Sequence, residues 1–586
     1  MNSKFKINIL LKILIVFYCC ISLQQLNAST IENGIISGEI HKPNVPEWTH
    51  NAVFYEVYPQ TFYDTDGNGI GDIPGIISKL DYIKSTGANA IWMNPAFVSP
   101  FRDGGYDIAD YYKIDPRYGT NEDAKRLFSE VHKRGMHIII DCVFGHTSID
   151  HPWFKESCKV DSNKYTNRYI WTNSTWQKFV MCGAVDGTVI NGYCSRNGNF
   201  LTNFFWSQPA LNFGYAEPNP SRPWEVSVNH PSVMELRIEM KNFLRFWLKN
   251  GADGFHMDMA SSLVKRDTIN KVAEIWKDVR SMLDKEYPQA FIIPEWCVPD
   301  KAMNAGFHAD FLHWLPEYWS LWQGESSRCL NGASNSYSFF DKEGKGDIMP
   351  FMNVYWNYYL KTRDTGYCSF VLSNLNLART NINRSKEELE IIFAFVLTMP
   401  GIPFIWYGEE LGMRQLYNIT AKEGAYAPRT GGRTPMQWDR TVNCGFSTAP
   451  ESMLYFPVDK NEDAPTVESE NADSKSLLNS FRKLTKIRTE EIAFRNYADL
   501  NILYAQPKKY PFIYARSNGN EVIIVILNPT NREETATFKT NINFSKSKLL
   551  NGVNQNITQN KTEVTIKVKP ISFSIIKIIK RSSYAK

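Results

Sequence analysis

The 586-residue chain lacks an excess of charge of either sign, and this narrows the classes of partner it can have. It carries 65 Lys and Arg residues against 61 Asp and Glu residues, which gives a net charge of +4. Proteins that bind nucleic acids present clustered basic residues, because their affinity comes from neutralising phosphates. Neither a basic block nor an acidic tail occurs in this sequence. We therefore expect no nucleic-acid partner.

The N-terminal apolar run is too short for a membrane span. Residues 13–23 fall below the roughly 20 apolar residues that a membrane helix needs. The run follows Lys4 and Lys6 and precedes Leu26-Asn27-Ala28, an order typical of a cleaved export signal. We predict that residues 1–28 are a signal peptide and that the mature protein is secreted. We expect no stable membrane span. Within the extracellular space, the gut lumen or a membrane-associated site are the more specific locations we consider.

Cysteine usage excludes a zinc site and agrees with export. No Cys-x-x-Cys motif and no cluster of histidines occurs. Cys182 and Cys194 bracket a loop rich in Gly and Asn, and we predict that they form a disulfide in an oxidising compartment. N-glycosylation sequons, which also fit secretion, lie at Asn173, Asn383, Asn418, Asn543, Asn556 and Asn560.

Short apolar runs alternate with amphipathic stretches from about residue 50 to residue 490. Eight such runs with helices between them predict a parallel (β/α)₈ TIM barrel rather than an open sheet. Helices with apolar residues at three-to-four spacing are expected over 238–249, 269–283 and 386–397. The expected strands are Val53–Tyr58, Ala90–Met93, His137–Val143, Gly254–Met257, Phe291–Ile293, Phe307–Leu312, Phe370–Leu372 and Pro403–Tyr407.

Two segments depart from this alternation. The interval between the third and fourth runs is about 110 residues, much longer than an ordinary crossover, and it predicts an inserted loop-rich subdomain at 147–225. After residue 494 the pattern changes to period-two alternation, which predicts a C-terminal antiparallel β-sandwich at 495–580. The barrel is then formed by 48–146 and 226–494.

The ends of the expected strands carry the candidate chemistry. In barrels of this kind the working residues lie at the C-terminal ends of the strands and in the loops that follow. The fourth strand ends at Asp258 and the fifth at Glu295. Two carboxylates about 5 Å apart on neighbouring strand ends suit a retaining glycosidase, with one as nucleophile and one as acid/base.

Four further sequence motifs match those of a known protein family. From Ala52 to about Ile578 the chain resembles the α-amylase superfamily, glycoside hydrolase family 13, and within it the insect maltase and sucrase type α-glucosidases. The resemblance implies α-glucosides or oligosaccharides as substrates. The motifs are Val57-Tyr-Pro-Gln-Thr-Phe62, Gly104-Gly-Tyr-Asp107, Trp406-Tyr-Gly-Glu-Glu-Leu-Gly-Met413 and Arg433-Thr-Pro-Met-Gln-Trp-Asp439.

This resemblance assigns roles to residues that match the family's motifs. Asp258 matches the nucleophile and Glu295 the acid/base. Tyr106 and His146 match residues that line the glucose subsite. Asp107 and Arg379 match the pair that grips the non-reducing end of the substrate.

The loop from Asp64 to Asp72 matches the family's calcium loop. It also makes chemical sense as a structural calcium site, because hard cations prefer oxygen ligands and glycines permit a tight wrap. The expected ligands are Asp64, Asp66, Asn68, Asp72 and the backbone carbonyl near Ile70.

Several departures from the family pattern fall in the pocket. Asn376 stands where the family has a third catalytic Asp, Leu375 where it has a His, and His256 where it has an Arg. A guanidinium is always charged and grips a carboxylate with two bonds, whereas imidazole beside Asp258 is positive only conditionally. We expect His256 to be a partial substitute at acid pH. Smaller departures are Gly145 for Asn, Pro294 for Gly and Ala210 for Asp.

These departures leave three functional hypotheses. The first is a secreted α-glucosidase-like protein with weak or lost hydrolysis, which binds terminal α-glucosyl units or serves a protein partner. The second is an active retaining exo-α-glucosidase of the maltase or sucrase type. The third is a membrane-anchored heavy subunit of an amino-acid transporter, which resembles this fold without its chemistry.

Overall fold

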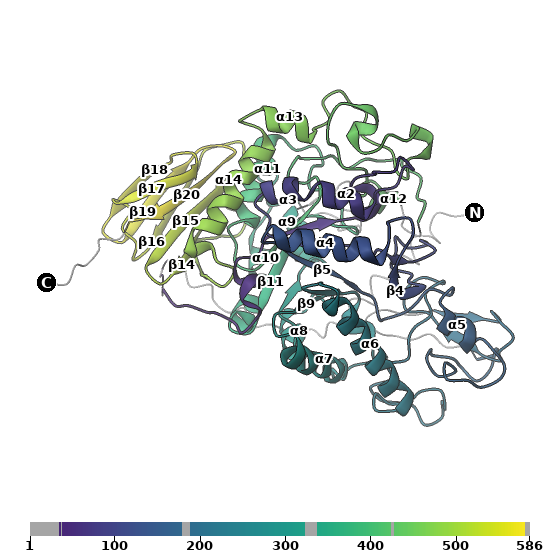
Figure 1. Cartoon of the computed structure of the whole chain (residues 1–586). Helices are drawn as coiled ribbons and strands as arrows, with labels where there is room; N and C mark the ends of the chain where they lie inside the picture. Colours follow the sequence, from purple (N-terminus) through teal and green to yellow (C-terminus); the bar gives the residue numbers. More distant parts are fainter. Residues whose placement is uncertain are drawn as a thin grey trace, which may run out of the picture.

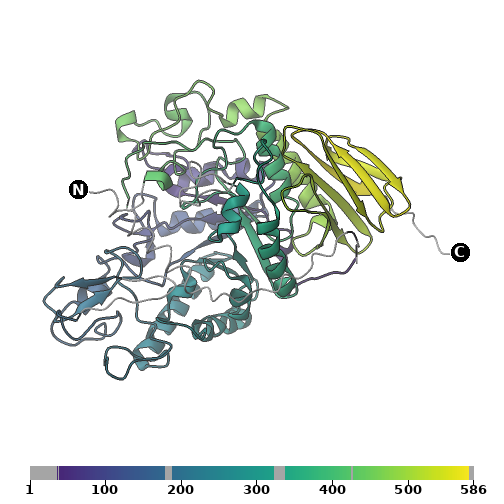
Figure 2. The same cartoon turned by 180° about the vertical axis from the view of Figure 1, so that it is seen from behind.

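The computed structural model describes residues 34, 36, 38–177, 188–322, 337–423 and 427–579. A central barrel carries an insertion on one side and a C-terminal pair of sheets on the other, as Figures 1 and 2 show from opposite directions. The predicted pair Cys182–Cys194 involves a residue outside this description and stays a prediction. The Cys194 side chain lies next to that of Cys158. Burial and a hydrogen bond between the two thiols raise the pKa of Cys158.

Eight parallel strands form the barrel, and all eight predicted runs are among them. Their order is β10-β11-β12-β1-β2-β5-β8-β9. The two ends of this sheet meet where the His308 N–H donates to the Ile292 carbonyl over 3.1 Å, which brings β9 and β10 together. The predicted barrel is therefore confirmed. The strands are β1 (Phe54–Val57), β2 (Ala90–Met93), β5 (His137–Cys142), β8 (Gly254–Met257), β9 (Phe291–Pro294), β10 (Ala309–Phe311), β11 (Tyr367–Val371) and β12 (Pro403–Trp406).

Several helices begin where a side chain accepts an N–H group of the first turn. Ser385 and Glu388 form a reciprocal capping box at the start of α11, one residue before the predicted helix. Helix α7 begins at Val272 rather than 269, because the Asp267 carboxylate accepts the N–H groups of Lys271 and Val272. The helices are α2 (Ile73–Ser78), α3 (Leu80–Ser85), α4 (Asn121–Lys133), α5 (Pro152–Ser157), α6 (Pro231–Lys249), α7 (Val272–Glu286), α8 (Pro299–Asn304), α9 (Pro316–Trp322), α10 (Met349–Thr362), α11 (Lys386–Val396), α12 (Ala427–Thr430), α13 (Val467–Ala472) and α14 (Leu477–Glu490).

Two small two-stranded sheets lie in the connections on the substrate side of the barrel. The first pairs β3 (Phe97–Val98) with β4 (Asp110–Ile114), and the second pairs β6 (Val189–Asn191) with β7 (Asn199–Leu201). The second belongs to the insertion between β5 and β8, which also contains α5 (Figure 1).

The C-terminal part is a sandwich of two antiparallel sheets with a shared apolar core, as predicted. One sheet has the order β13-β14-β15-β20-β17 and the other β16-β19-β18. The sequence did not reveal β17 or β18, because both are mostly exposed and polar, so their alternation is weak. The strands are β13 (Asp499–Tyr504), β14 (Phe512–Asn518), β15 (Glu521–Asn528), β16 (Glu534–Lys539), β17 (Ser547–Gly552), β18 (Asn556–Asn560), β19 (Glu563–Val568) and β20 (Ser572–Ile578).

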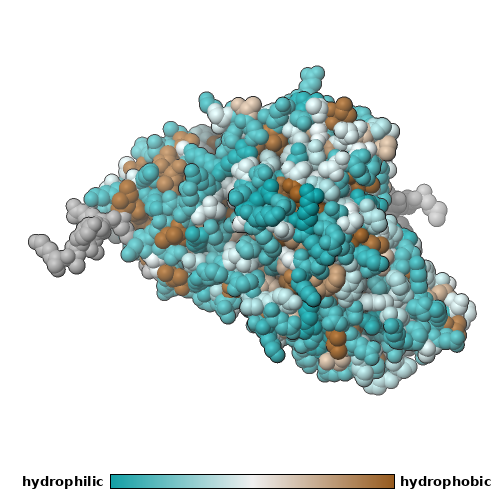
Figure 3. All heavy atoms as spheres, in the orientation of Figure 1, coloured by the Kyte–Doolittle hydropathy of each residue, from teal (hydrophilic) through white to brown (hydrophobic). Residues whose placement is uncertain are grey.

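The visible surface is mainly hydrophilic, with small separate hydrophobic patches over the barrel and the sandwich (Figure 3). Among the described residues, no helix has both the length and the apolar character to cross a membrane.

Candidate active site

The two predicted catalytic carboxylates follow neighbouring barrel strands. Strands β8 and β9 pair in parallel with Met257 opposite Pro294, so the next residues, Asp258 and Glu295, emerge side by side. The Met259 N–H donates to Glu295 Oε2 over 3.4 Å and ties the two strand ends together. The structure thus brings Asp258 and Glu295 to one place, as their positions at strand ends predicted.

Burial and neighbouring charges shift the pKa values of both carboxyls of this pair. Burial, then the charges of Glu295 and Asp141, raise the pKa of Asp258 well above its usual value. Burial alone would raise the pKa of Glu295 as well, but the nearby His313 imidazole outweighs it and lowers that pKa to about 2. Retention needs an ionised nucleophile and a protonated acid. Both requirements therefore depend on the charges that surround the two carboxyls.

Glu295 owes this state to two neighbours that the sequence did not reveal. Trp314 Nε1 donates to Glu295 Oε1 over 3.0 Å. His313 Nε2 lies 3.7 Å from the same oxygen. Both residues follow β10, and no motif in the sequence marked them.

His256 pairs with Asp141 and not with the nucleophile. Its Nδ1 lies 2.6 Å from Asp141 Oδ1, and Trp92 Nε1 donates to the other oxygen over 2.9 Å. Asp141 is fully buried, which raises its pKa, and the charge of His256 opposes that rise. Within the described part of the chain, no side chain donates a hydrogen bond to the Asp258 carboxylate. The Asp141 hydrogen bond engages Nδ1 of His256, and a partial replacement of an Arg at Asp258 stays a prediction.

Asn376 is positioned by a turn and held by a cation. The Asn374 side chain accepts the N–H groups of Asn376 and Leu377 over 2.8 and 2.9 Å. The Arg429 guanidinium, from α12, donates to Asn376 Oδ1. Its positive charge also acts against the raised pKa of Asp258. Leu375 is 3% exposed and packs in the apolar core, so it offers no polar group to the pocket.

A buried ion pair anchors the segment that carries Arg429. Arg433 and Glu423 pair with both side chains fully buried. Glu423 also accepts the hydroxyl groups of Tyr58 and Tyr455 over 2.5 and 2.8 Å. The Arg433 Nε–H donates to the Leu375 carbonyl over 2.9 Å, which joins this segment to the turn at Asn376.

The structure does not pair Asp107 with Arg379. The Asp107 carboxylate accepts the Ser99 hydroxyl over 2.9 Å and backbone N–H groups, and burial raises its pKa to about 6. Arg379 is fully buried, where it donates to the Tyr407 carbonyl over 2.8 Å and lies 3.8 Å from Glu409. The Nε and Nη2 groups of Arg379 have no hydrogen-bond partner among the described residues, so the predicted joint grip on a substrate stays a prediction. Asp107 remains a pocket residue.

His146 and Tyr106 are joined by a hydrogen bond, and Tyr106 lies near the carboxylates. His146 Nε2 donates to the Tyr106 carbonyl over 3.1 Å, and burial lowers the pKa of His146 to about 3, so the ring is neutral. Burial, then the charges of Asp141 and Asp258, raise the pKa of Tyr106, which places its ring among the carboxylates.

A neighbouring contact explains the departure at Gly145. Asn203 Nδ2 lies 3.4 Å from His146 Nδ1, and a Cβ at Gly145 would come within 2.5 Å of the same amide nitrogen. The Asn203 amide therefore occupies the space that a larger side chain at Gly145 would need. Lys265, which the sequence did not single out, donates to Asn203 Oδ1 over 2.7 Å, and burial lowers its pKa to about 7.

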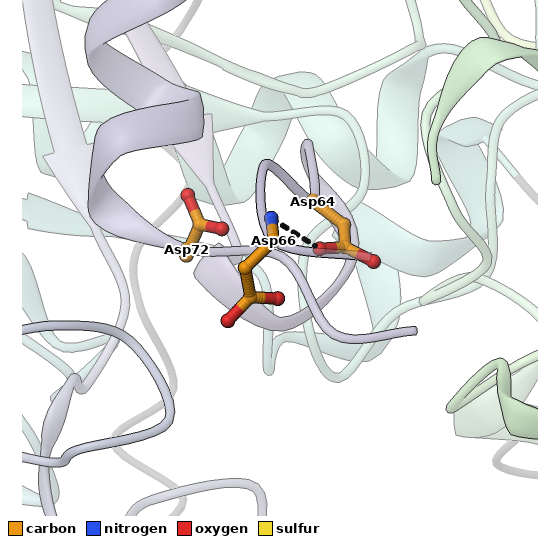
Figure 4. Close-up of side chains that lie close together, drawn as sticks. All are labelled: Asp64, Asp66 and Asp72. Carbon is orange, nitrogen blue, oxygen red and sulfur yellow. Dashed lines mark hydrogen bonds between the residues drawn. The ribbon is translucent and has the colours of Figure 1, made fainter. Parts of the chain in front are cut away.

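The acidic loop before α2 gathers three carboxylates (Figure 4). Oxygen atoms of Asp64, Asp66 and Asp72 all lie within 4.8 Å of one another. Burial, then Asp64, raise the pKa of Asp66, which reflects negative charges held close together. Asn68 Oδ1 accepts the Ile70 N–H over 2.8 Å, so both further predicted ligands belong to the same tight turn. This crowding of oxygen atoms fits a hard cation such as calcium.

Comparison with known proteins agrees with the barrel. The family model for the α-amylase catalytic domain matches residues 56–496. An oligo-1,6-glucosidase of Parageobacillus thermoglucosidasius is 30% identical over 565 residues, which cover 84% of this chain and 92% of that protein. A trehalose synthase/amylase TreS of Mycolicibacterium smegmatis is 30% identical over 502 residues, 77% of this chain and 78% of its own.

Solved structures show the same fold. The trehalulose synthase MutB from Pseudomonas mesoacidophila MX-45 superimposes with a TM-score of 0.73 at 24% identity, covering 90% of this chain and 99% of that chain. The family model spans most of this chain, and the curated relatives align along nearly their whole lengths. The chain belongs to the α-amylase catalytic-domain family, glycoside hydrolase family 13.

Proposed function

We propose that this protein is an α-glucosidase-like binder of terminal α-glucosyl units in which hydrolysis is weak or lost. One observation carries the proposal: the Asp258 carboxylate has no hydrogen-bond donor among the described side chains, while His256 is engaged by Asp141. Such a nucleophile is neither aimed nor kept ionised.

The charge distribution around the reacting centre supports the same conclusion. An oxocarbenium-like transition state gains from negative charge beside it. The neutral amide of Asn376, bonded to Arg429, supplies none. Loss of one preorganised electrostatic partner costs roughly 3–4 kcal/mol, or 10²–10³ in rate. Two or three such losses in one pocket are not additive, yet about half their sum still lowers turnover by roughly 10³.

The groups that would hold a sugar remain in place. Asp107 and His146 are both buried in the pocket wall with fixed hydrogen bonds, and Tyr106 lies between them and the carboxylates. Oligo-1,6-glucosidases and glucan 1,6-α-glucosidases are among the relatives, which favours α-glucosides as the ligand class. We extend this to maltose- and sucrose-like ligands on the resemblance to the insect type.

The second candidate is an active retaining exo-α-glucosidase. The adjacent emergence of Asp258 and Glu295 favours it, because the two groups that make and break bonds are both present. Nothing in the comparisons supports the transporter heavy subunit. If hydrolysis is lost, we propose that a protein partner binds the sugar-bound form of this chain.

Secretion, N-glycosylation and calcium binding complete the proposal. All six sequon asparagines are exposed, so none is shielded from the glycosylating enzyme. The calcium ligands would be Asp64, Asp66, Asn68, Asp72 and the Ile70 carbonyl. The ion would join the loop before α2 to Ser447, whose hydroxyl donates to Asp64 over 2.5 Å.

The first prediction concerns turnover. The triple variant Asn376→Asp, Leu375→His and His256→Arg should hydrolyse p-nitrophenyl α-glucoside and sucrose at least ~10³-fold faster than the native chain between pH 4 and 8, because it restores the pocket charges. Initial rates on secreted protein measure this. Asn376→Asp alone keeps the side-chain size and guards against a folding failure of the triple variant. A native rate within about tenfold of the triple variant contradicts weak hydrolysis.

The second prediction concerns His313. His313→Gln removes the group that lowers the pKa of Glu295, so that pKa should rise from about 2 toward 4.5. A larger fraction of Glu295 is then protonated at every pH above about 2, so kcat/KM for the aryl glucoside should exceed the native value from pH 4 to 6 and approach it only as the pH falls toward 2. His132→Gln, on the half-exposed His132 of α4, is the control. Identical pH profiles for the His313 variant and the native chain would refute the role of His313.

The third prediction concerns calcium. Removing divalent ions with a chelator should lower the melting temperature by a few degrees, since a ligand at 100 times its Kd contributes about 2.7 kcal/mol. Added calcium should restore the loss, and Asp66→Asn should abolish the response. Asp161→Asn, at an exposed Asp outside the loop, should leave it intact. A melting temperature that ignores both chelator and calcium argues against the site.

The fourth prediction concerns export. Protein collected from the medium of eukaryotic cells should begin at Ser29 and lose mass on treatment with an N-glycanase. N-terminal sequencing and intact mass measure both. A chain that stays in the cell, retains residues 1–28 or shows no mass change speaks against the corresponding part of the proposal.

A further inference from the structure

A hairpin of the insertion lies against the candidate pocket at both of its ends. Thr202 and Pro209 pair across its base, and the Asn203 N–H donates to the Gln208 carbonyl over 2.9 Å. The Asn203 amide then contacts His146, and Gln208 Nε2 donates to Asp103 Oδ2 over 2.8 Å. Because His146 and Asp103 flank the pocket, the tip of the hairpin is held at its rim.

Three consecutive aromatic residues form this tip. Phe204 is 43% exposed and Trp206 is 55% exposed, whereas most large aromatic side chains of the described chain are buried. Phe205 packs against Phe204 with ring centroids 4.4 Å apart. The turn is already closed by Gln208, whose side-chain oxygen accepts the Phe205 N–H over 2.8 Å. Backbone and amide bonds close the hairpin, so an exposed indole is not needed to fold it, and a cluster of exposed aromatic surface is a mark of a binding site.

Arg102 connects this tip to the pocket floor. Its backbone N–H donates to Asp107 Oδ2 over 3.1 Å, and its guanidinium lies 6.0 Å from the Trp206 ring. Asp150 fixes that guanidinium at 2.7 Å. A flat apolar ring beside a fixed hydrogen-bond donor is complementary to a pyranose, which has apolar C–H faces and a rim of hydroxyl groups.

We propose that Trp206, supported by Phe204, is a specificity-determining platform that stacks the second or third sugar ring of an α-linked oligosaccharide. The proposal rests on the proposed function, because the terminal glucosyl unit of the same ligand occupies the pocket at Asp107 and His146. It does not depend on hydrolysis. The platform makes the protein prefer oligosaccharides over single glucosides.

Titration calorimetry with two ligands tests this. Maltotriose is long enough to reach the rim, and methyl α-glucoside fills the pocket alone. Trp206→Ala should weaken maltotriose binding about 3- to 10-fold, the range expected for one lost aromatic stack, and leave methyl α-glucoside binding unchanged. Trp206→Phe, which keeps a flat ring, should restore most of the loss. Trp176→Ala is the matched control, because Trp176 is 87% exposed in the same insertion but outside the hairpin.

Further outcomes separate this proposal from the proposed function. Equal maltotriose affinity in the native chain and Trp206→Ala, or equal losses in the Trp206 and Trp176 variants, overturns the platform while leaving the pocket intact. Asp107→Ala should weaken both ligands. If it weakens neither although maltotriose binding still requires Trp206, the pocket assignment fails and the aromatic platform stands. A native chain that binds neither ligand overturns both.

Discussion

The hydrogen bond between His256 Nδ1 and Asp141 Oδ1 spans 2.6 Å at the base of the pocket, and both residues are almost fully buried. A buried carboxylate needs a partner, and removing one side of such a pair costs about 3–5 kcal/mol. His256 therefore cannot serve Asp141 and also aim Asp258 with the same nitrogen. This hydrogen bond fixes His256 beside Asp141, whose charge, after burial and the charge of Glu295, raises the pKa of Asp258, while His313 and Trp314 act on Glu295.

Binding and catalysis separate in this arrangement because they depend on different groups. Sugar recognition uses side chains that are rigidly hydrogen-bonded, such as Asp107 and His146. Bond cleavage needs protein groups that stabilise the positive charge developing on the sugar in the transition state. Asn376 is neutral and Arg429, which donates to it, is positive, so this pair offers no negative charge for that purpose. We propose that the same pocket holds a glucosyl unit but cleaves it slowly. Its aromatic rim extends the recognition surface without touching the chemistry.

The barrel strands and the two carboxylates at their ends were predictable, because a buried parallel strand leaves a local apolar run and the residue after it faces the pocket. The partner of His256 was not, since Asp141 lies 115 residues away and the contact depends on the register of β5 against β8. Arg429 reaches Asn376 across 53 residues through a loop with no periodic pattern. The hairpin at 202–209 was not predicted for the same reason, because its position depends on amide contacts to His146 and Asp103. Motif matching pointed to Asp107 and Arg379, but it could not show that Arg379 also donates to the Tyr407 carbonyl.

Formation of a covalent glycosyl-enzyme is the step that an unsupported Asp258 should fail. Incubation with a 5-fluoro-α-glucosyl fluoride, followed by intact-mass measurement and peptide mapping, reports that step directly. The account predicts that the native chain keeps its unmodified mass. The triple variant Asn376→Asp, Leu375→His and His256→Arg should instead gain one glycosyl group on its nucleophile. Labelling of Asp258 in the native chain at a rate similar to that variant would contradict the account.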